Sequence, residues 1–154
     1  METLIARPTV RLAQADDRAA VLVMAQHFLA STPYGADAGG DAIGRLVDLL
    51  VTRPDLGCGF VMASDTGLVG MIGVVLFPHL LSGACTAAEV VWWVEPEART
   101  TRAGVQLLAA AEAWARRQGA TIFQMGSWND DLDRFYARRG FHPRERLWEK
   151  SLEE

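Results

Sequence analysis

One continuous stretch, from Glu89 to Gly119, constrains the fold of this chain more than any other. It opens with the apolar run VVWWV, breaks at Pro96, passes through a turn rich in Thr and Arg, and continues with apolar residues at helical spacing. The run predicts a strand covered on both faces, and the periodic segment predicts an amphipathic helix. A strand, a turn and a helix in this order direct the unpaired amides at the helix start toward the strand end, which is an anion-binding arrangement.

The remainder of the chain predicts a mixed α/β (α+β) fold. The expected element order is strand, helix, helix, three strands, helix, strand, helix, strand, which favours one mixed sheet with helices on both faces over a doubly wound parallel fold. A small-residue loop at 31–40 separates the first two helices. The expected strands cover 9–13, 59–63, 68–76, 88–94, 121–128 and 147–152, and the apolar helix faces cover 20–28, 43–50, 104–115 and 132–136.

Length and composition predict a single soluble domain spanning 1–154. The chain has 154 residues, half of them hydrophobic and 22% charged, which is ordinary for a globular protein. No apolar run approaches the roughly 20 residues needed to cross a bilayer. The opening METLIARPTVRL lacks the features of a secretion signal, and two unpatterned cysteines indicate no disulfide framework. We therefore expect a cytoplasmic protein that does not bind a membrane.

Charge and metal-ligand spacing exclude further classes of function. A net charge of −4 leaves no basic footprint for nucleic acid, so a neutral or cationic substrate fits better. The three histidines do not cluster with cysteines or carboxylates, and we expect no metal.

Two short motifs carry a family resemblance. The first is RTTRAG at 99–104, placed where the central strand passes into the long helix; the second is Asn129, followed seven residues later by Tyr136 and then by Gly140 and Phe141. In this combination the chain resembles the GNAT superfamily of N-acetyltransferases, whose signature is Gln or Arg, two residues, Gly, one residue, and Gly or Ala. The resemblance covers nearly the whole chain. It implies a mostly antiparallel sheet of six to seven strands with about four helices.

One position departs from the family signature, because Arg102 stands where the first glycine is expected. Glycine lets the backbone approach a phosphate closely at no steric cost. Either the turn keeps helical angles and Arg102 reaches a phosphate, or cofactor binding is damaged. We favour the first alternative, since the amides that follow still occupy the first turns of a helix.

The resemblance implies transfer of an acetyl group from acetyl-CoA to a primary amine of a small molecule or a protein, by direct attack through a tetrahedral intermediate. The pyrophosphate requires donors, which the amides at the helix start would provide, and the oxyanion requires a fixed donor, for which the Val94 amide is the candidate. The expected cofactor-binding residues are Val94, Arg99, Thr100, Thr101, Arg102, Ala103, Gly104, Val105 and Asn129.

Two residues are candidates for proton transfer. Glu89 opens an apolar strand beside two tryptophans, where loss of water would raise its pKa toward neutrality and suit a base; the alternative is a solvated carboxylate at a strand end. Tyr136 matches the family's acid position, and the alternative is a tyrosine that only packs. Asn129 is equally well explained as a helix cap.

Three questions stay open at this point. The rival function is a catalytically silent GNAT-like module that binds CoA or a partner protein. The acceptor is undefined, although Asp37, Asp41, Glu89 and Glu95 would form an acidic pocket for polyamines or aminoglycosides if the fold gathered them. An exposed edge strand near the C-terminus would also make a homodimer unsurprising.

Overall fold

Five strands form one sheet in the computed structural model, which describes residues 7–37 and 41–153. The strands lie side by side in chain order; neighbouring strands are antiparallel except for the parallel pair β4 and β5. This confirms the mixed, mostly antiparallel α/β fold. The strands are β1 (Thr9–Leu12), β2 (Gly57–Ser64), β3 (Gly67–Pro78), β4 (Cys85–Val94) and β5 (Ile122–Gln124), and the helices are α1 (Arg18–Ser31), α2 (Ala42–Thr52), α3 (Ala103–Arg117) and α4 (Asp130–Arg138).

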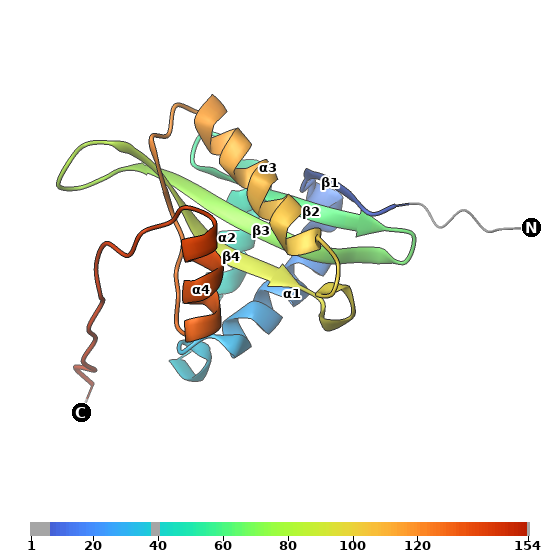
Figure 1. Cartoon of the computed structure of the whole chain (residues 1–154). Coiled ribbons are helices and arrows are strands. Elements are labelled where there is room, and N and C mark those ends of the chain that lie inside the picture. Colours follow the sequence, from blue (N-terminus) through green and yellow to red (C-terminus); the bar gives the residue numbers. More distant parts are fainter. Residues whose placement is uncertain (1–6, 38–40, 154) are drawn as a thin grey trace, which may run out of the picture.

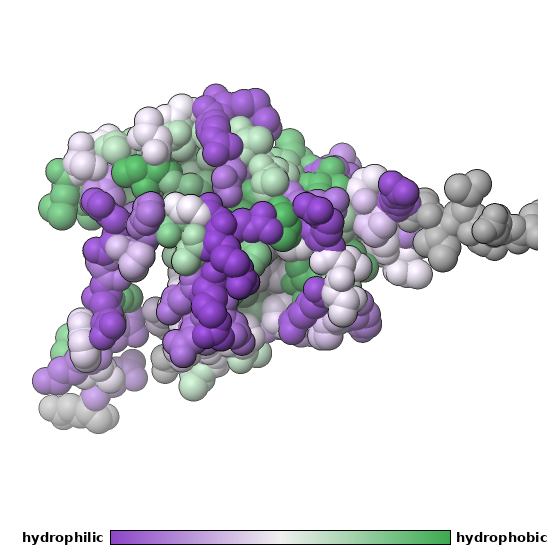
Figure 2. All heavy atoms as spheres, in the orientation of Figure 1, coloured by the Kyte–Doolittle hydropathy of each residue, from purple (hydrophilic) through white to green (hydrophobic). Residues whose placement is uncertain are grey.

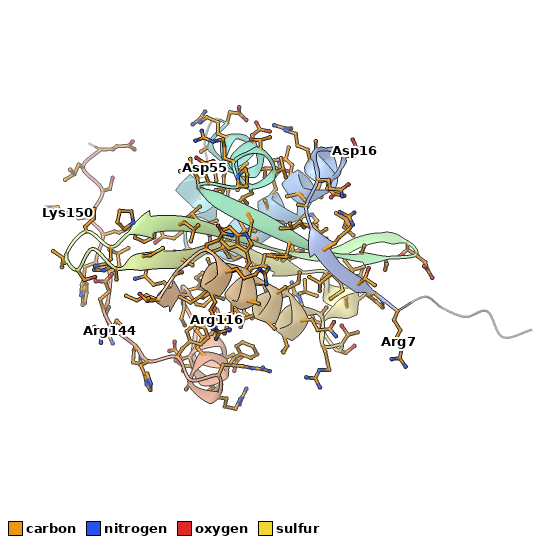
Figure 3. The ribbon with its side chains drawn as sticks, turned by 90° about the horizontal axis from the view of Figure 1, so that it is seen from above. Arg7, Asp16, Asp55, Arg116, Arg144 and Lys150 are labelled. Atoms are coloured by element: carbon orange, nitrogen blue, oxygen red, sulfur yellow. The ribbon has the colours of Figure 1, made fainter. Side chains whose placement is uncertain are left out.

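The helices cover both faces of the sheet, as Figures 1 and 3 show, with α1 and α2 on one face and α3 and α4 on the other. Each face has its own apolar core. Val91 and Trp93 of β4 pack with α1 and α2, while Trp92 and Val94 pack with α3, because successive side chains of a strand point to opposite faces. The outer surface of α4 is hydrophilic in Figure 2, so α4 buries only its inner side. No helix in the described part of the chain is both long and apolar enough to cross a bilayer.

The expected last strand at 147–152 is wrong, and the described sheet has five strands where six to seven were predicted. After α4 the chain runs away from the sheet without regular structure (Figure 1). Trp148 is 84% exposed and Leu152 is 89% exposed. The charged residues in RERLWEK leave this segment no continuous apolar face to bury, so burial does not offset the entropy that would be lost on ordering it as a strand.

The fifth strand is also shorter than the predicted 121–128, because β5 ends at Gln124. Its pairing with β4 stops at Ala88 opposite Gln124. Beyond that point the backbone groups of Gly126 bond to side chains of β4 and α4 instead of to the β4 backbone. The two strands therefore separate, and within the described residues no strand pairs with this edge of β4 from Glu89 to Val94.

Candidate active site

A cleft of about 460 Å³ lies where β4 and β5 separate. It is lined from both sides of the sheet: Phe28 and Ser31 come from α1, whereas Gly104 and Tyr136 come from α3 and α4. Three buried polar side-chain atoms in the described part of the chain lack a hydrogen-bond partner, and all three belong to lining residues, Glu89, Trp92 and Trp93. Unsatisfied buried polar groups are rare, so their concentration here marks a candidate functional site.

Glu89 lies in the wall of this cleft, at an irregularity in β4. The register between β3 and β4 shifts so that Val74 lies opposite Glu89 and Gly73 lies opposite Val91, a β-bulge that re-aims the Glu89 side chain. Its Oε2 accepts a hydrogen bond from the Gly126 N–H at 3.3 Å, and its Oε1 is buried without a partner. Burial raises the pKa of Glu89 to about 7, against a smaller lowering by the Gly126 amide. The solvated strand-end alternative is therefore wrong.

Tyr136 is buried on the α3 side of the same cleft. Its hydroxyl donates to the Gly126 carbonyl at 2.9 Å, and its ring stacks on Trp92 with centroids 6.3 Å apart. Burial raises the pKa of Tyr136 above its ordinary value, and the nearby carboxylates of Glu89 and Asp133 raise it further. The phenol thus stays protonated at neutral pH and lines the cleft, with its hydroxyl hydrogen directed at the Gly126 carbonyl.

The amide of Val94 faces the open edge of β4. Glu95 N–H donates to Val69 O across the sheet, and Val94 lies opposite Gly70 in the register. In an antiparallel pair these facts make Val94 and Gly70 a non-hydrogen-bonded pair, so the Val94 N–H and C=O point away from β3. A carbonyl oxygen in the cleft could accept from this N–H.

Some backbone amides at the start of α3 are already hydrogen-bonded within the turn, and others are free. Thr101 N–H donates to Ala98 O, and Ala103 N–H donates to the Thr101 hydroxyl. The N–H groups of Arg102, Gly104 and Val105 have no partner among the described residues, and they stand at the positive end of the α3 dipole. These three amides could receive a phosphate.

Arg102 occupies its position without strain. Its φ of −87° and ψ of 12° lie in ordinary backbone space, and no described residue other than glycine has a positive φ. The turn therefore needs no glycine-like φ at Arg102, although the ψ of this residue is not helical. Gly104 serves packing instead, because a Cβ there would lie 3.3 Å from the Trp92 ring. The start of α3 therefore approaches β4 closely.

Family membership follows from sequence comparison. The model of the Acetyltransferase (GNAT) family matches residues 23–141. The chain belongs to the GNAT family. A search of curated proteins finds no match.

Solved structures share the fold of this GNAT protein. It is similar to a transcriptional regulator from Bacillus halodurans C-125, with 21% identity over 95% of this chain and 100% of that chain and a TM-score of 0.74. An acetyltransferase from Trypanosoma brucei matches with 20% identity, 94% and 99% coverage and a TM-score of 0.73. The aminoglycoside N-acetyltransferase AAC(6')-Iy in complex with CoA matches with 14% identity, 98% coverage of both chains and a TM-score of 0.77. At these identities the likeness establishes the fold.

The predicted cofactor residues of this GNAT protein fall into two groups. Those that line the cleft are Val94, Arg99, Thr101, Gly104, Val105 and Asn129, and those that do not are Thr100, Arg102 and Ala103. Asn129 is the N-cap of α4, since its Oδ1 accepts from the Leu132 N–H at 2.9 Å, so the cap interpretation is confirmed.

Arg99 turns back over the end of β4. Its Nε donates to Val94 O at 2.9 Å, and its guanidinium lies 4.5 Å from the centre of the Trp93 ring. This places a cation on the α1 side of the cleft, away from the free amides of α3.

The acidic pocket expected from the sequence is not assembled. Asp41 lies near Arg18 at the start of α1, whereas Phe28, near the end of that helix, lines the cleft about 15 Å further along. Glu95 lies 3.6 Å from the His27 Nδ1 and lines a separate cavity. The side chain of Asp37 lies outside the described part of the structure. Of the three acidic side chains that the structure describes, Glu89 lines the cleft, whereas Asp41 and Glu95 do not.

Two residues of the site, Gly126 and Phe28, are not indicated as site residues by the sequence. Phe28 was assigned to the buried stripe of the first helix, and Gly126 to a strand interior. A glycine within an expected strand often marks a bulge or a close backbone approach, and that signal could have located the strand separation. Among the described residues no group of three His, Cys, Asp or Glu side chains is arranged to hold a metal ion.

Proposed function

We propose that this protein transfers an acetyl group from acetyl-CoA to a primary amine. The observation that carries the proposal is the cleft through the open edge of β4. Its wall holds Glu89, whose Oε1 is buried without a hydrogen-bond partner, and free α3 amides lie at one end. A GNAT neighbour of the same fold was crystallised with CoA, which agrees with this choice of cosubstrate.

The cosubstrate would enter from the α3 side. Its diphosphate would receive hydrogen bonds from the amides of Arg102, Gly104 and Val105, with the α3 dipole adding attraction for negative charge. The thioester of acetyl-CoA supplies an activated acetyl group. The Val94 N–H would then donate to the acetyl oxygen and stabilise the negative charge that develops there during attack.

Glu89 would take the proton from the attacking amine. An alkyl amine with a pKa of about 10.4 is roughly one part in a thousand neutral at pH 7, a cost of about 4 to 5 kcal/mol. A carboxylate whose pKa is about 7 is well matched to remove this proton near neutral pH. Tyr136 would donate its hydroxyl proton to the departing thiolate. Its raised pKa keeps the phenol protonated at neutral pH but also makes it a weak acid, so the help that it gives is modest.

A catalytically silent module is the rival function. It would give no reason for a buried carboxylate oxygen without a partner, because such a group lowers the stability of the fold and is typical of functional sites. One structural neighbour is named a transcriptional regulator, so a binding role requires a direct test.

Two measurements test the proposal. Acetyl-CoA at about 100 times its Kd should stabilise the folded protein by about 2.7 kcal/mol, seen as a rise in Tm, and adenosine, which lacks the pyrophosphate, should stabilise it far less. Amine-dependent release of free CoA thiol should follow in the wild type. Stabilisation without thiol release from any amine would favour the silent module. No stabilisation at all would overturn the proposed acetyl transfer and leave only a module that binds a partner protein.

Two further expectations accompany this function. A cytoplasmic location and a homodimer stay predictions; light scattering across a range of protein concentrations would test the dimer.

A further inference from the structure

The α1 side of the cleft is an aromatic enclosure. Phe28, Trp93 and Trp128 line it, and the rings of Phe28 and Trp128 meet edge to face with centroids 5.6 Å apart. Phe28 and Trp93 belong to α1 and β4, whereas Trp128 follows β5, so the enclosure is fixed by three separate parts of the fold. Such walls favour a flat apolar body, because aromatic rings prefer edge-to-face and offset contacts with one another.

The charges on this side of the cleft are few and opposite in sign. Glu89 provides one carboxylate, and Arg99 provides a permanent cation above the Trp93 ring. The Nε of Arg99 donates to Val94 O, whereas its two terminal nitrogens have no partner among the described residues. A substrate with one amine therefore meets one carboxylate. A second ammonium group would find no further carboxylate among the described lining residues and would lie close to a guanidinium.

We infer that the acceptor is a small molecule with a single primary amine on an aromatic body and without a second cationic group. The inference rests on the proposed function, because it assigns the second substrate of the same site. The amine would lie at Glu89, and the ring would lie between Phe28, Trp93 and Trp128. Polyamines and aminoglycosides are disfavoured, which reverses the expectation from the acidic residues in the sequence.

Three acceptors separate ring from charge in the wild-type protein. Comparison of 1,5-diaminopentane with pentylamine isolates the second charge, and comparison of phenethylamine with pentylamine isolates the ring. We expect kcat/KM to fall at least about tenfold at each step from phenethylamine to pentylamine to the diamine. Kanamycin, an aminoglycoside with several amines, should be the poorest acceptor.

Two variants assign these preferences to residues. Phe28→Ala should reduce the ratio of kcat/KM for phenethylamine over pentylamine, and Arg99→Glu should raise the ratio for the diamine over pentylamine. Each ratio is measured at one acetyl-CoA concentration, so an effect on the cosubstrate cancels. Arg144→Glu makes the same charge change in the exposed C-terminal segment and should leave both ratios unchanged.

The outcomes separate this inference from the proposed function. A diamine or kanamycin that is acetylated more efficiently than phenethylamine overturns the inference and leaves the function standing. Acetyl-CoA binding without acetylation of any aromatic amine also overturns it. A protein that neither binds acetyl-CoA nor releases thiol with any amine removes the proposed function itself.

Discussion

Glu89 and Tyr136 are joined through one residue, Gly126. The Gly126 N–H donates to Glu89 Oε2 at 3.3 Å, and the Gly126 carbonyl accepts from the Tyr136 hydroxyl at 2.9 Å. The residue lies just beyond β5, where that strand leaves β4. The separation of the strands and the placement of both titratable groups therefore have the same local cause.

Replacement of Glu89 by Gln should remove a base and change the pH profile. Because a base acts only when deprotonated, wild-type kcat/KM should rise as pH increases through about 7, the pKa of Glu89. In Glu89→Gln this inflection should vanish, leaving only the later rise from the amine, and the rate near pH 8 should fall about 10²- to 10⁴-fold. Steady-state kinetics from pH 5.5 to 9.5 measures both effects. An inflection near pH 7 that persists in the variant would assign it to another group.

The same residue should make stability depend on pH. Folding raises the pKa of Glu89 from an ordinary 4.5 to about 7, so the folded state holds its proton more tightly than the unfolded chain. Its contribution to stability is full below about pH 4.5 and is lost as pH rises through about 7. One pKa unit equals about 1.4 kcal/mol, so the loss is about 3 kcal/mol. Urea unfolding at pH 5 and pH 8 should show Glu89→Gln gaining stability relative to wild type as pH rises; a constant difference would contradict the burial.

Loss of the Tyr136 hydroxyl should lower kcat without moving the Glu89 inflection. Tyr136→Phe keeps the ring on Trp92 but removes the proton donor, and we expect kcat to fall about tenfold, since a thiolate of pKa about 8.5 leaves with modest help. The chain has two tyrosines, and Tyr34 is 44% exposed, so Tyr34→Phe is a matched control. Equal kinetics in wild type and Tyr136→Phe would restrict Tyr136 to packing.

Substitution at Arg102 should decide how the missing glycine is compensated. Its backbone angles are ordinary, so Arg102→Gly gives the turn no freedom that it needs. If the guanidinium reaches a phosphate, the Kd for acetyl-CoA should weaken about fivefold to tenfold in Arg102→Gly, and Arg102→Lys should retain most of the affinity. Isothermal titration calorimetry measures both. Tighter binding in Arg102→Gly would mean that the arginine obstructs the site.

Much of this fold was available from the sequence alone. Local periodicity, turn residues and the run VVWWV predicted the order of the elements and the passage from β4 into α3, because these depend on neighbouring residues. The apolar strand around it indicated Glu89 as a candidate, whereas the family resemblance indicated Tyr136. The local signals failed for 147–152, where charged residues interrupt the apolar ones and Leu147, Trp148 and Leu152 stay exposed.

Only the tertiary structure decided what surrounds those candidates. Three features depend on which distant segments of the chain meet: the desolvation of Glu89, the direction of the Val94 amide, and the separation of Asp41 and Glu95 from the cleft. A sequence pattern does not give the distance between such segments. The opening between β4 and β5 depends on Gly126 bonding to two side chains from elsewhere in the chain. The sequence thus determined the elements and the candidate groups, while long-range packing determined the protonation, the exposure and the charge of the cleft.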